Sequence, residues 1–209
     1  VTFVKNNDGT LDLANAQSIK TVNIARDHNH VSLTNSAINT VNVDTNKGEA
    51  FDLTLTSPVA LTVNYVNSKP DEYHSFPRTG DFHRAIIADE ATSVNLNIDG
   101  YTNIQDQPKH PMIDISAPRE YLQAAKAKTI NINIAKTTDI NKYYADSYQL
   151  KNVTALQTIN YVNENDENRT VDDVDSGFDL RTRNMDSNNS SDLDNLSTLN
   201  VKTGNKFNI

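Results

Sequence analysis

The chain lacks cysteine and tryptophan altogether, and it has only six glycines and six prolines. Without cysteine there can be no disulfide, no thiolate zinc site and no cysteine nucleophile. No hydrophobic run approaches the roughly 18 apolar residues that a membrane-spanning helix needs, and no basic-then-apolar leader opens the sequence. Because the first residue is Val1 rather than Met, we expect a processed chain or a fragment of a larger protein.

Positive charge is also scarce. Lys and Arg total 19 against 27 Asp and Glu, which gives a net charge of −8. Such a chain repels phosphate backbones and anionic membrane surfaces, so nucleic acid is not an expected partner. The sequence has no G-x-S-x-G, no phosphate-binding P-loop and no H-E-x-x-H, so no catalytic motif points to an enzyme.

What the sequence does contain is one hexad repeated seven times: an apolar or small residue, any residue, Thr or Ser, an apolar residue, Asn, and an apolar residue. The copies are Ile19 to Ile24, Ile38 to Val43, Ala60 to Tyr65, Ala91 to Leu96, Ala127 to Ile132, Leu156 to Tyr161 and Leu196 to Val201. Alternation with period 2 predicts a strand with its apolar side chains inward, such as Val22 and Ile24. Thr21 and Asn23 then lie on the opposite face, and stacked copies form ladders of Thr and Asn.

A shorter apolar–polar–apolar piece comes before most hexads. The pieces are Leu11 to Leu13, Val31 to Leu33, Phe51 to Leu53, Ile113 to Ile115 and Tyr148 to Leu150. A unit of two short strands and about 20 residues cannot bury its own apolar side, but stacked units share one core. We therefore predict a mainly β fold, a parallel β-solenoid of about seven irregular coils forming one elongated domain over residues 1–209. A β-sandwich of separate antiparallel strands is the alternative.

Several stretches lengthen the unit. The longest are 66–84, 99–111, 136–146 and 163–191, and all follow a hexad, which predicts that they leave from one corner of the stack and build a binding face. Residues 119–126 have helix-forming residues without a breaker, which predicts one short helix.

The stretch 163–195 is an acidic insertion rich in Asn, Asp and Ser. Hard oxygen donors at short spacing suit calcium, and two clusters offer them. The candidate calcium ligands are Asp173, Asp175 and Asp179 around Gly177, and Asp186, Asp192 and Asp194 with Asn188 nearby. A solvated acidic loop is the other interpretation of the same residues.

Two weaker patterns invite other chemistry. His28 and His30, with His74 and His83 in a later insertion, are ligand types for zinc or nickel, although turn residues between coils explain the first two equally well. A row of Asp12, Asp52 and Asp114 on one face is the arrangement expected of a polysaccharide-degrading β-helix enzyme. An exposed or turn-facing Asp ladder with a structural role is the alternative, and the lack of Trp removes the best stacking surface for a sugar. The Thr ladder also resembles the flat hydroxyl arrays of ice-binding proteins, but the irregular coil lengths argue against that function.

The hexads, read together with pieces such as Leu11-Asp12-Leu13, resemble the Thr-, Asn- and Val-rich repeats of bacterial surface-layer (S-layer) proteins and large secreted adhesins. A fainter likeness is to leucine-rich repeats, through Ile38, Val41, Val43 and Asn46. The S-layer resemblance implies a secreted, extracellular β-solenoid that forms lattices or adhesive stalks and binds calcium. We therefore expect a structural or binding module of a bacterial cell-surface protein, whose partners are further copies of itself or a cell-surface glycan or protein. The alternative is a polysaccharide-degrading or carbohydrate-binding β-helix protein.

Overall fold

The structure is a computed structural model, and it describes residues 2–3, 9–24, 30–44, 51–66, 84–99, 120–135, 146–164, 177–181, 193–203 and 206–208. All structural statements below concern these residues. They form strands joined by short turns, and no helix occurs among them. In particular, this described part contains no helix that is long and apolar enough to cross a membrane.

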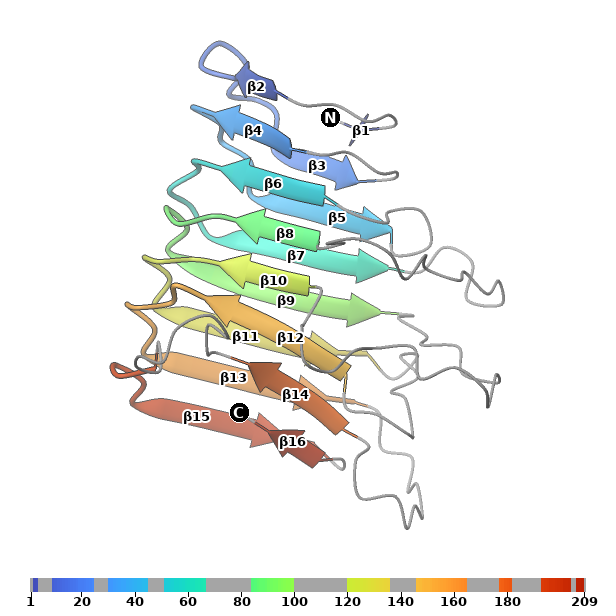
Figure 1. Ribbon diagram of the computed structural model, residues 1–209, viewed down its shortest axis with the longest axis vertical. Helices are drawn as coiled ribbons and strands as arrows, with labels where there is room; N and C mark the ends of the chain where they lie inside the picture. Colours follow the sequence, from blue (N-terminus) through green and yellow to red (C-terminus); the bar gives the residue numbers. More distant parts are fainter. Residues whose placement is uncertain are drawn as a thin grey trace.

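The strands form two sheets of eight, and successive strands along the chain alternate between the two (Figure 1). Sheet A contains β1 (Thr2–Phe3), β3 (Thr21–Ile24), β5 (Thr40–Asp44), β7 (Leu61–Val66), β9 (Ser93–Asp99), β11 (Thr129–Ile134), β13 (Thr158–Asn163) and β15 (Thr198–Lys202). Sheet B contains β2 (Gly9–Asp12), β4 (His30–Thr34), β6 (Phe51–Leu55), β8 (Arg84–Ile87), β10 (Glu120–Gln123), β12 (Asp146–Lys151), β14 (Gly177–Arg181) and β16 (Lys206–Asn208).

Every strand pair in these two sheets is parallel. The predicted mainly β, parallel fold is therefore confirmed, and the alternative of antiparallel strands is wrong for the described residues. One strand of sheet B, the turn after it and the next strand of sheet A form a unit, and the units stack along the long axis with the chain ends at opposite ends (Figure 1).

The core lies between the sheets. Apolar residues alternate with polar ones along the interior strands of sheet A, so that in β11 Ile130, Ile132 and Ile134 are buried while Thr129 and Asn131 are half-buried. The same alternation buries Val22 and Ile24, as the hexad predicts. Side chains of equivalent positions stack on one another from unit to unit, which gives one continuous cluster rather than separate cores.

The strands of sheet B agree with the sequence prediction only in part. Four predicted pieces lie in or at the end of β2, β4, β6 and β12, whereas residues 113–115 lie outside the described residues. The strand before the fifth hexad is instead β10, within the stretch predicted to be helical. The helix prediction is wrong because residues 120–123 pair in register with β8 and β12, which places Leu122 in the core column of Ile86 and Leu150. Burial in that column outweighs the weak helix preference of an isolated segment.

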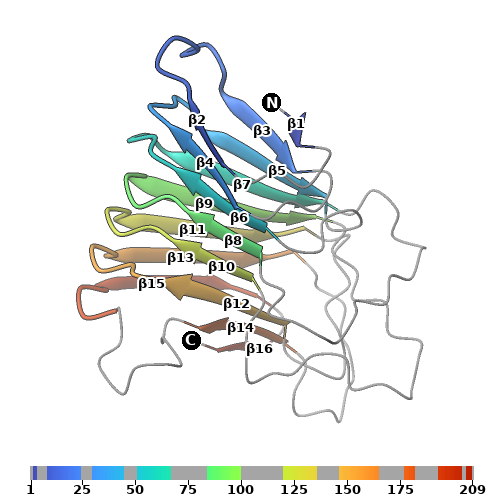
Figure 2. The ribbon, with the colours of Figure 1, turned by 45° about the horizontal axis from the view of Figure 1, so that its top comes forward.

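The turns from sheet B to sheet A form a row of corners along one side of the molecule, and these turns are all described except for residues 182–192 (Figure 2). Most corners contain two apolar residues three positions apart, and the N–H of the second donates to the C=O of the first. These pairs are Leu13–Ala16, Ala88–Ala91, Ala124–Ala127, Val153–Leu156 and Leu193–Leu196, with N···O distances of 2.9–3.2 Å. In these corners a hydrogen bond within the turn pairs one backbone N–H with one C=O, and the apolar pair covers that side of the core.

Two corners also need an unusual backbone. Asn35 and Asn152 follow β4 and β12 with φ of 52° and 50°, in the left-handed region. Asn adopts this region more readily than other residues with a β-carbon, which explains an Asn at both positions.

The predicted insertions fall mainly on one kind of connection. Residues 67–83, 100–119, 136–145 and 165–176 each lie between the end of a sheet A strand and the start of a sheet B strand. The acidic insertion predicted for 163–195 is not a single loop, because it contains the end of β13, all of β14 and the corner at 193–195.

Candidate functional site

The outer face of sheet A is the most regular surface of the described residues, and we call it the Asn–Thr face. It consists of Thr21, Asn23, Thr40, Asn42, Thr62, Asn64, Ser93, Asn95, Asn97, Thr129, Asn131, Asn133, Thr158, Asn160, Thr198 and Asn200. These side chains are partly or fully exposed, and they alternate with the buried apolar residues of the same strands. The face exists because parallel pairing repeats one residue type at the same height in successive units.

A first ladder of asparagines runs along this face from β3 to β11. Asn42 Nδ2 donates to Asn23 Oδ1, Asn64 Nδ2 to Asn42 Oδ1, and Asn97 Nδ2 to Asn64 Oδ1, each over 2.8 Å. Asn133 Nδ2 continues the ladder to Asn97 Oδ1 over 2.9 Å. The spacing of about 4.8 Å between neighbouring strands lets each amide span to the next, as in other in-register asparagine stacks.

A second ladder runs parallel to the first and is displaced from it by two residues along the strands. Asn131 Nδ2 donates to Asn95 Oδ1 over 2.7 Å, Asn160 Nδ2 to Asn131 Oδ1 over 2.7 Å, and Asn200 Nδ2 to Asn160 Oδ1 over 2.8 Å. The hexads alone align Asn64 with Asn95, but the structure pairs Asn64 with Asn97 and Thr62 with Asn95. A shift of two residues keeps every side chain on its own face, so β9, which carries asparagines at both positions, belongs to both ladders.

Asp44 and Asp99 end β5 and β9 in the register of this face, but the side chains of the Asn–Thr face that the structure describes carry no charge from β3 to β13. From β3 to β13, the outward side chains that the structure describes are Thr, Ser and Asn, together with Val162. Amides and hydroxyls both donate and accept hydrogen bonds, and the amides keep one N–H outside the ladder. These groups can hydrogen-bond a neutral polar ligand, such as a sugar hydroxyl or another polar sheet.

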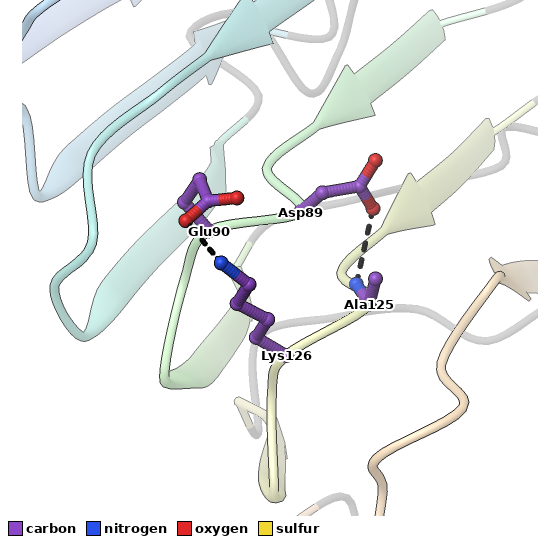
Figure 3. A network of polar contacts seen from close by, with 4 residues as sticks. All are labelled: Asp89, Glu90, Ala125 and Lys126. Atoms are coloured by element: carbon purple, nitrogen blue, oxygen red, sulfur yellow. Dashed lines mark hydrogen bonds and ion pairs between the residues drawn. The ribbon is translucent and has the colours of Figure 1, made fainter.

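The corners hold a second set of polar contacts, seen in Figure 3. Asp89 Oδ1 accepts the backbone N–H of Ala125 in the next unit over 3.0 Å, and Lys126 Nζ lies 2.6 Å from Glu90 Oε2. Asp89 Oδ2 also accepts Gln123 Nε2 over 2.7 Å. Asn152 Nδ2, two units further on, also lies 3.4 Å from Asp89 Oδ1. Because every partner belongs to another unit, these contacts join units and leave little of the Asp89 carboxylate for a ligand.

Asp12 has a similar corner role. Its Oδ1 accepts Asn35 Nδ2 of the next unit and the backbone N–H of Ala14, each over 2.9 Å. These two hydrogen bonds, the Asn35 amide first, hold the pKa of the Asp12 carboxyl below its ordinary value of 3.8.

The proposed carboxylate row is not assembled. Asp12 is in register with Thr34, whereas Asp52 is in register with His30, four residues earlier on β4 and hence about 13 Å along the strand direction. Asp114 lies outside the described residues. Asp52 Oδ2 is 2.7 Å from His30 Nδ1, with 17% of the Asp52 side chain exposed and 74% of the His30 side chain exposed. The two described carboxylates therefore have separate structural partners.

The predicted metal ligands are only partly placed. Asp173, Asp175, Asp186 and Asp192, as well as His28, His74 and His83, lie outside the described residues. Asp179 is the third residue of β14, in register with Ser147 and Asn208, and Asp194 is an exposed corner residue. Within the described ranges, no group of three or more His, Asp or Glu residues is placed to hold a metal ion.

Two features of the site escaped the sequence prediction. Asn97 and Asn133, which continue the first ladder, lie just beyond the hexad, and the N-x-N spacing in β9 and β11 is the signal that identifies them. The corner pairs have a signal too, because the second apolar residue is the first residue of the hexad in the copies that begin at Ala91, Ala127, Leu156 and Leu196.

Comparison with protein-family models, with curated proteins and with solved structures finds no match for this chain. Its function is therefore argued from the two sheets, the Asn–Thr face and the corners themselves.

Proposed function

We propose that this chain is a structural and binding module of a bacterial cell-surface protein, built as an irregular parallel β-solenoid of about seven coils. The strict alternation of strands between two parallel sheets supports the solenoid, because each unit then forms one turn around a shared core. The resemblance of the hexads to S-layer and adhesin repeats supports the extracellular location, and the absence of cysteine is in keeping with it.

The observation that carries the proposal is the Asn–Thr face. It offers hydrogen-bond donors and acceptors at a fixed spacing over every unit, held in place by the two ladders. A ligand that repeats along its length, such as a cell-surface polysaccharide or a neighbouring module, gains from many weak contacts made at once. Adhesion and self-assembly both use this multivalent contact.

The alternative function is degradation of such a polysaccharide. It needs two carboxylates flanking the scissile bond, about 5–10 Å apart. Asp12 and Asp52, the two described members of the proposed row, are separated along the strand direction by more than that and have other partners. Binding without cleavage is therefore the function that these residues support better.

The test is to incubate the chain with a panel of purified bacterial cell-surface polysaccharides, and to measure binding by biolayer interferometry and cleavage by release of reducing ends. We expect binding without release, weakened in the variant Asn133→Lys, because a lysine there places bulk and charge on the Asn–Thr face. Ser32→Lys, on the outer face of sheet B, is the matched control and should bind as the parent does. Released oligosaccharides would instead establish the degradative alternative, and equal loss in both variants would remove the Asn–Thr face from the proposal.

Calcium is the cofactor that the proposal includes, bound by the acidic stretch 163–195. The charge of that stretch and the S-layer resemblance support it. The check is the thermal unfolding midpoint measured in calcium, in magnesium and in a chelator. A midpoint raised by calcium alone supports calcium binding, whereas equal midpoints in all three would leave the stretch as a solvated segment.

A further inference from the structure

Two columns of polar side chains run side by side along the Asn–Thr face from β3 to β11, and we call them the polar track. One column is the first ladder. The other lies beside it, because each strand places a Thr or Asn two positions before its ladder asparagine, and the register keeps both columns continuous through the shift between β7 and β9. The rungs of the track are Thr21 with Asn23, Thr40 with Asn42, Thr62 with Asn64, Asn95 with Asn97, and Asn131 with Asn133.

The polar track ends at a defined position on β11. In the next strand Asn160 continues the column of Asn131, but Val162 stands where the first ladder would need a further asparagine. Asn133, which donates to Asn97, is therefore the last rung of the first ladder. A valine side chain offers no hydrogen-bond donor or acceptor, so a ligand that follows this ladder loses its polar contacts beyond Asn133.

The ladder holds the amides of the track in one orientation. Each bond of the first ladder uses one N–H of the later asparagine and one lone pair of the earlier Oδ1. The second N–H and the second lone pair of each amide lie outside the ladder. Because a side chain that is already ordered loses less conformational entropy on binding, these amides can bind a ligand at a lower cost than free surface asparagines.

The spacing of the rungs selects the shape of the ligand. Neighbouring strands of a sheet lie about 4.8 Å apart, so the track repeats a pair of polar side chains at that interval along the stack. An extended chain of β-1,4-linked six-membered sugar rings advances by a closely similar distance per ring, whereas an α-1,4-linked chain of the same sugar curves away from a straight line. A β-1,4-linked chain can therefore place one ring on each rung.

The charge around the track favours a neutral ligand. None of the side chains of the track is charged. The column beyond the first ladder contains Asp44 and Asp99 in register with Val66, and the whole chain has a net charge of −8. An anionic polysaccharide is repelled by this excess of negative charge, whereas a neutral one is not.

We propose that the polar track binds a neutral, β-1,4-linked polysaccharide that lies along the axis of the stack, with one sugar ring on each rung. Because the chain has no Trp to stack on a ring, the affinity comes from hydrogen bonds to the ring hydroxyls that are repeated from rung to rung. The inference rests on the proposed binding function, for which it names the class of ligand, its direction and the end of its site at Asn133.

The experiment titrates the isotope-labelled chain with cello-oligosaccharides of increasing length and follows the side-chain amide signals of its asparagines by nuclear magnetic resonance. Malto-oligosaccharides, which contain the same sugar in α-1,4 linkage, are the matched control ligands. We expect the affinity for cello-oligosaccharides to rise by about two- to tenfold with each added ring, the equivalent of one net hydrogen bond, until the chain covers the track. The affinity for malto-oligosaccharides should not rise in this way.

Two substitutions should move the end of the track in opposite directions. Val162→Asn adds an asparagine in register with Asn133, so the affinity should keep rising for one ring more than in the parent. Asn133→Lys removes the last rung, so the rise should stop one ring earlier. Asn200→Lys adds the same charge to the Asn–Thr face outside the track and should leave the dependence on length unchanged. A gain in Val162→Asn cannot arise from misfolding, and far-ultraviolet circular dichroism checks that the other variants are folded.

Equal binding of cello- and malto-oligosaccharides overturns the inference, and so does a dependence on length that neither Val162→Asn nor Asn133→Lys changes. Signals of the track that shift when the chain is concentrated without sugar would mean that a second copy covers this face, which also overturns it. A chain that binds other cell-surface polysaccharides but no cello-oligosaccharide loses this inference and keeps the proposed binding function. A chain that binds no polysaccharide at all loses both.

Discussion

At the scale of single residues, the interior asparagines of the ladders have a role that their exposure alone does not suggest. Asn42 donates to Asn23 and accepts from Asn64, and Asn131 and Asn160 have the same double role in the second ladder. Each is part-buried, so its amide competes less with water than a fully exposed one. A rung in the middle therefore joins three units, whereas Asn200 at the end joins two.

That difference predicts unequal costs of removal. Asn42→Ala deletes two side-chain hydrogen bonds and leaves two partner groups to water, so we expect the free energy of unfolding to fall by about 1–3 kcal/mol. Asn200→Ala, which is exposed and deletes one bond, should cost under about 1 kcal/mol. Thermal unfolding followed by circular dichroism separates the two, because 1 kcal/mol corresponds to about 2–4 °C in a chain of this size. Equal midpoints for the two variants would mean that the number of ladder hydrogen bonds removed does not set the cost of the substitution.

Asp12 gives a pH dependence whose sign follows from its lowered pKa. Because the folded pKa lies below the unfolded one, Asp12 stabilises the fold fully above its ordinary pKa of 3.8, and this contribution is lost as pH falls through the folded pKa. We expect Asp12→Asn to melt below the parent at pH 7, by a small margin because the carboxylate is exposed, and the difference to shrink below pH 3.8.

The matched variant is Asn35→Gly, which removes the amide donor to Asp12 but keeps a residue suited to φ of 52°. Melting curves from pH 7 downward should show the same shrinking difference for both variants. A difference that is constant across pH in both would show that the Asp12 charge is not responsible.

At the scale of elements, the sequence predicted sheet A well and sheet B less well, for a physical reason. The interior strands of sheet A bury one face in the core and turn the other toward solvent, so apolar and polar residues alternate along them without a break. The hexad therefore marks seven of the eight strands. Sheet B strands have less regular patterns. In β8 both Ala85 and Ile86 are fully buried, so alternation does not reveal this strand.

The pairing register between neighbouring strands is the property that the sequence predicts least well. Aligning Asn64 with Asn95 or with Asn97 buries the same apolar faces, since the two alignments differ by one full period of the strand. The choice depends on contacts with neighbouring strands that no local pattern records. The acidic spacing that predicts the candidate calcium ligands likewise carries no sign that Asp179 belongs to a strand.

A buried pair of serines joins the corner between β4 and β5 to the corner of the next unit. The Oγ atoms of Ser36 and Ser57, in adjacent units, lie 2.8 Å apart, Ser57 Oγ donates to the Ser36 carbonyl over 3.0 Å, and both side chains are buried. Ser57→Ala leaves the buried Ser36 hydroxyl without this partner and should cost about 1–3 kcal/mol. The double variant Ser36→Ala with Ser57→Ala should cost less than the sum of the two single changes, because no buried hydroxyl is then left without its partner. Chemical denaturation of the three variants forms a double-mutant cycle, and additive costs would contradict direct coupling.

At the scale of the whole molecule, stability should vary along the stack and not be uniform. Each unit is stabilised by its neighbours on both sides, and the two end units have a neighbour on one side only. The central strands β9 and β11 carry rungs of both ladders, and their inward side chains are almost entirely buried. β15 is exposed along its whole length.

Amide hydrogen exchange should therefore be slowest in β9 and β11 and become progressively faster toward β1 and β15, since opening from an end breaks one interface whereas opening in the middle breaks two. Exchange measured by mass spectrometry on peptides from each strand tests this order. Uniform exchange rates from β3 to β15 would contradict this order and would show that the stack opens as one cooperative unit.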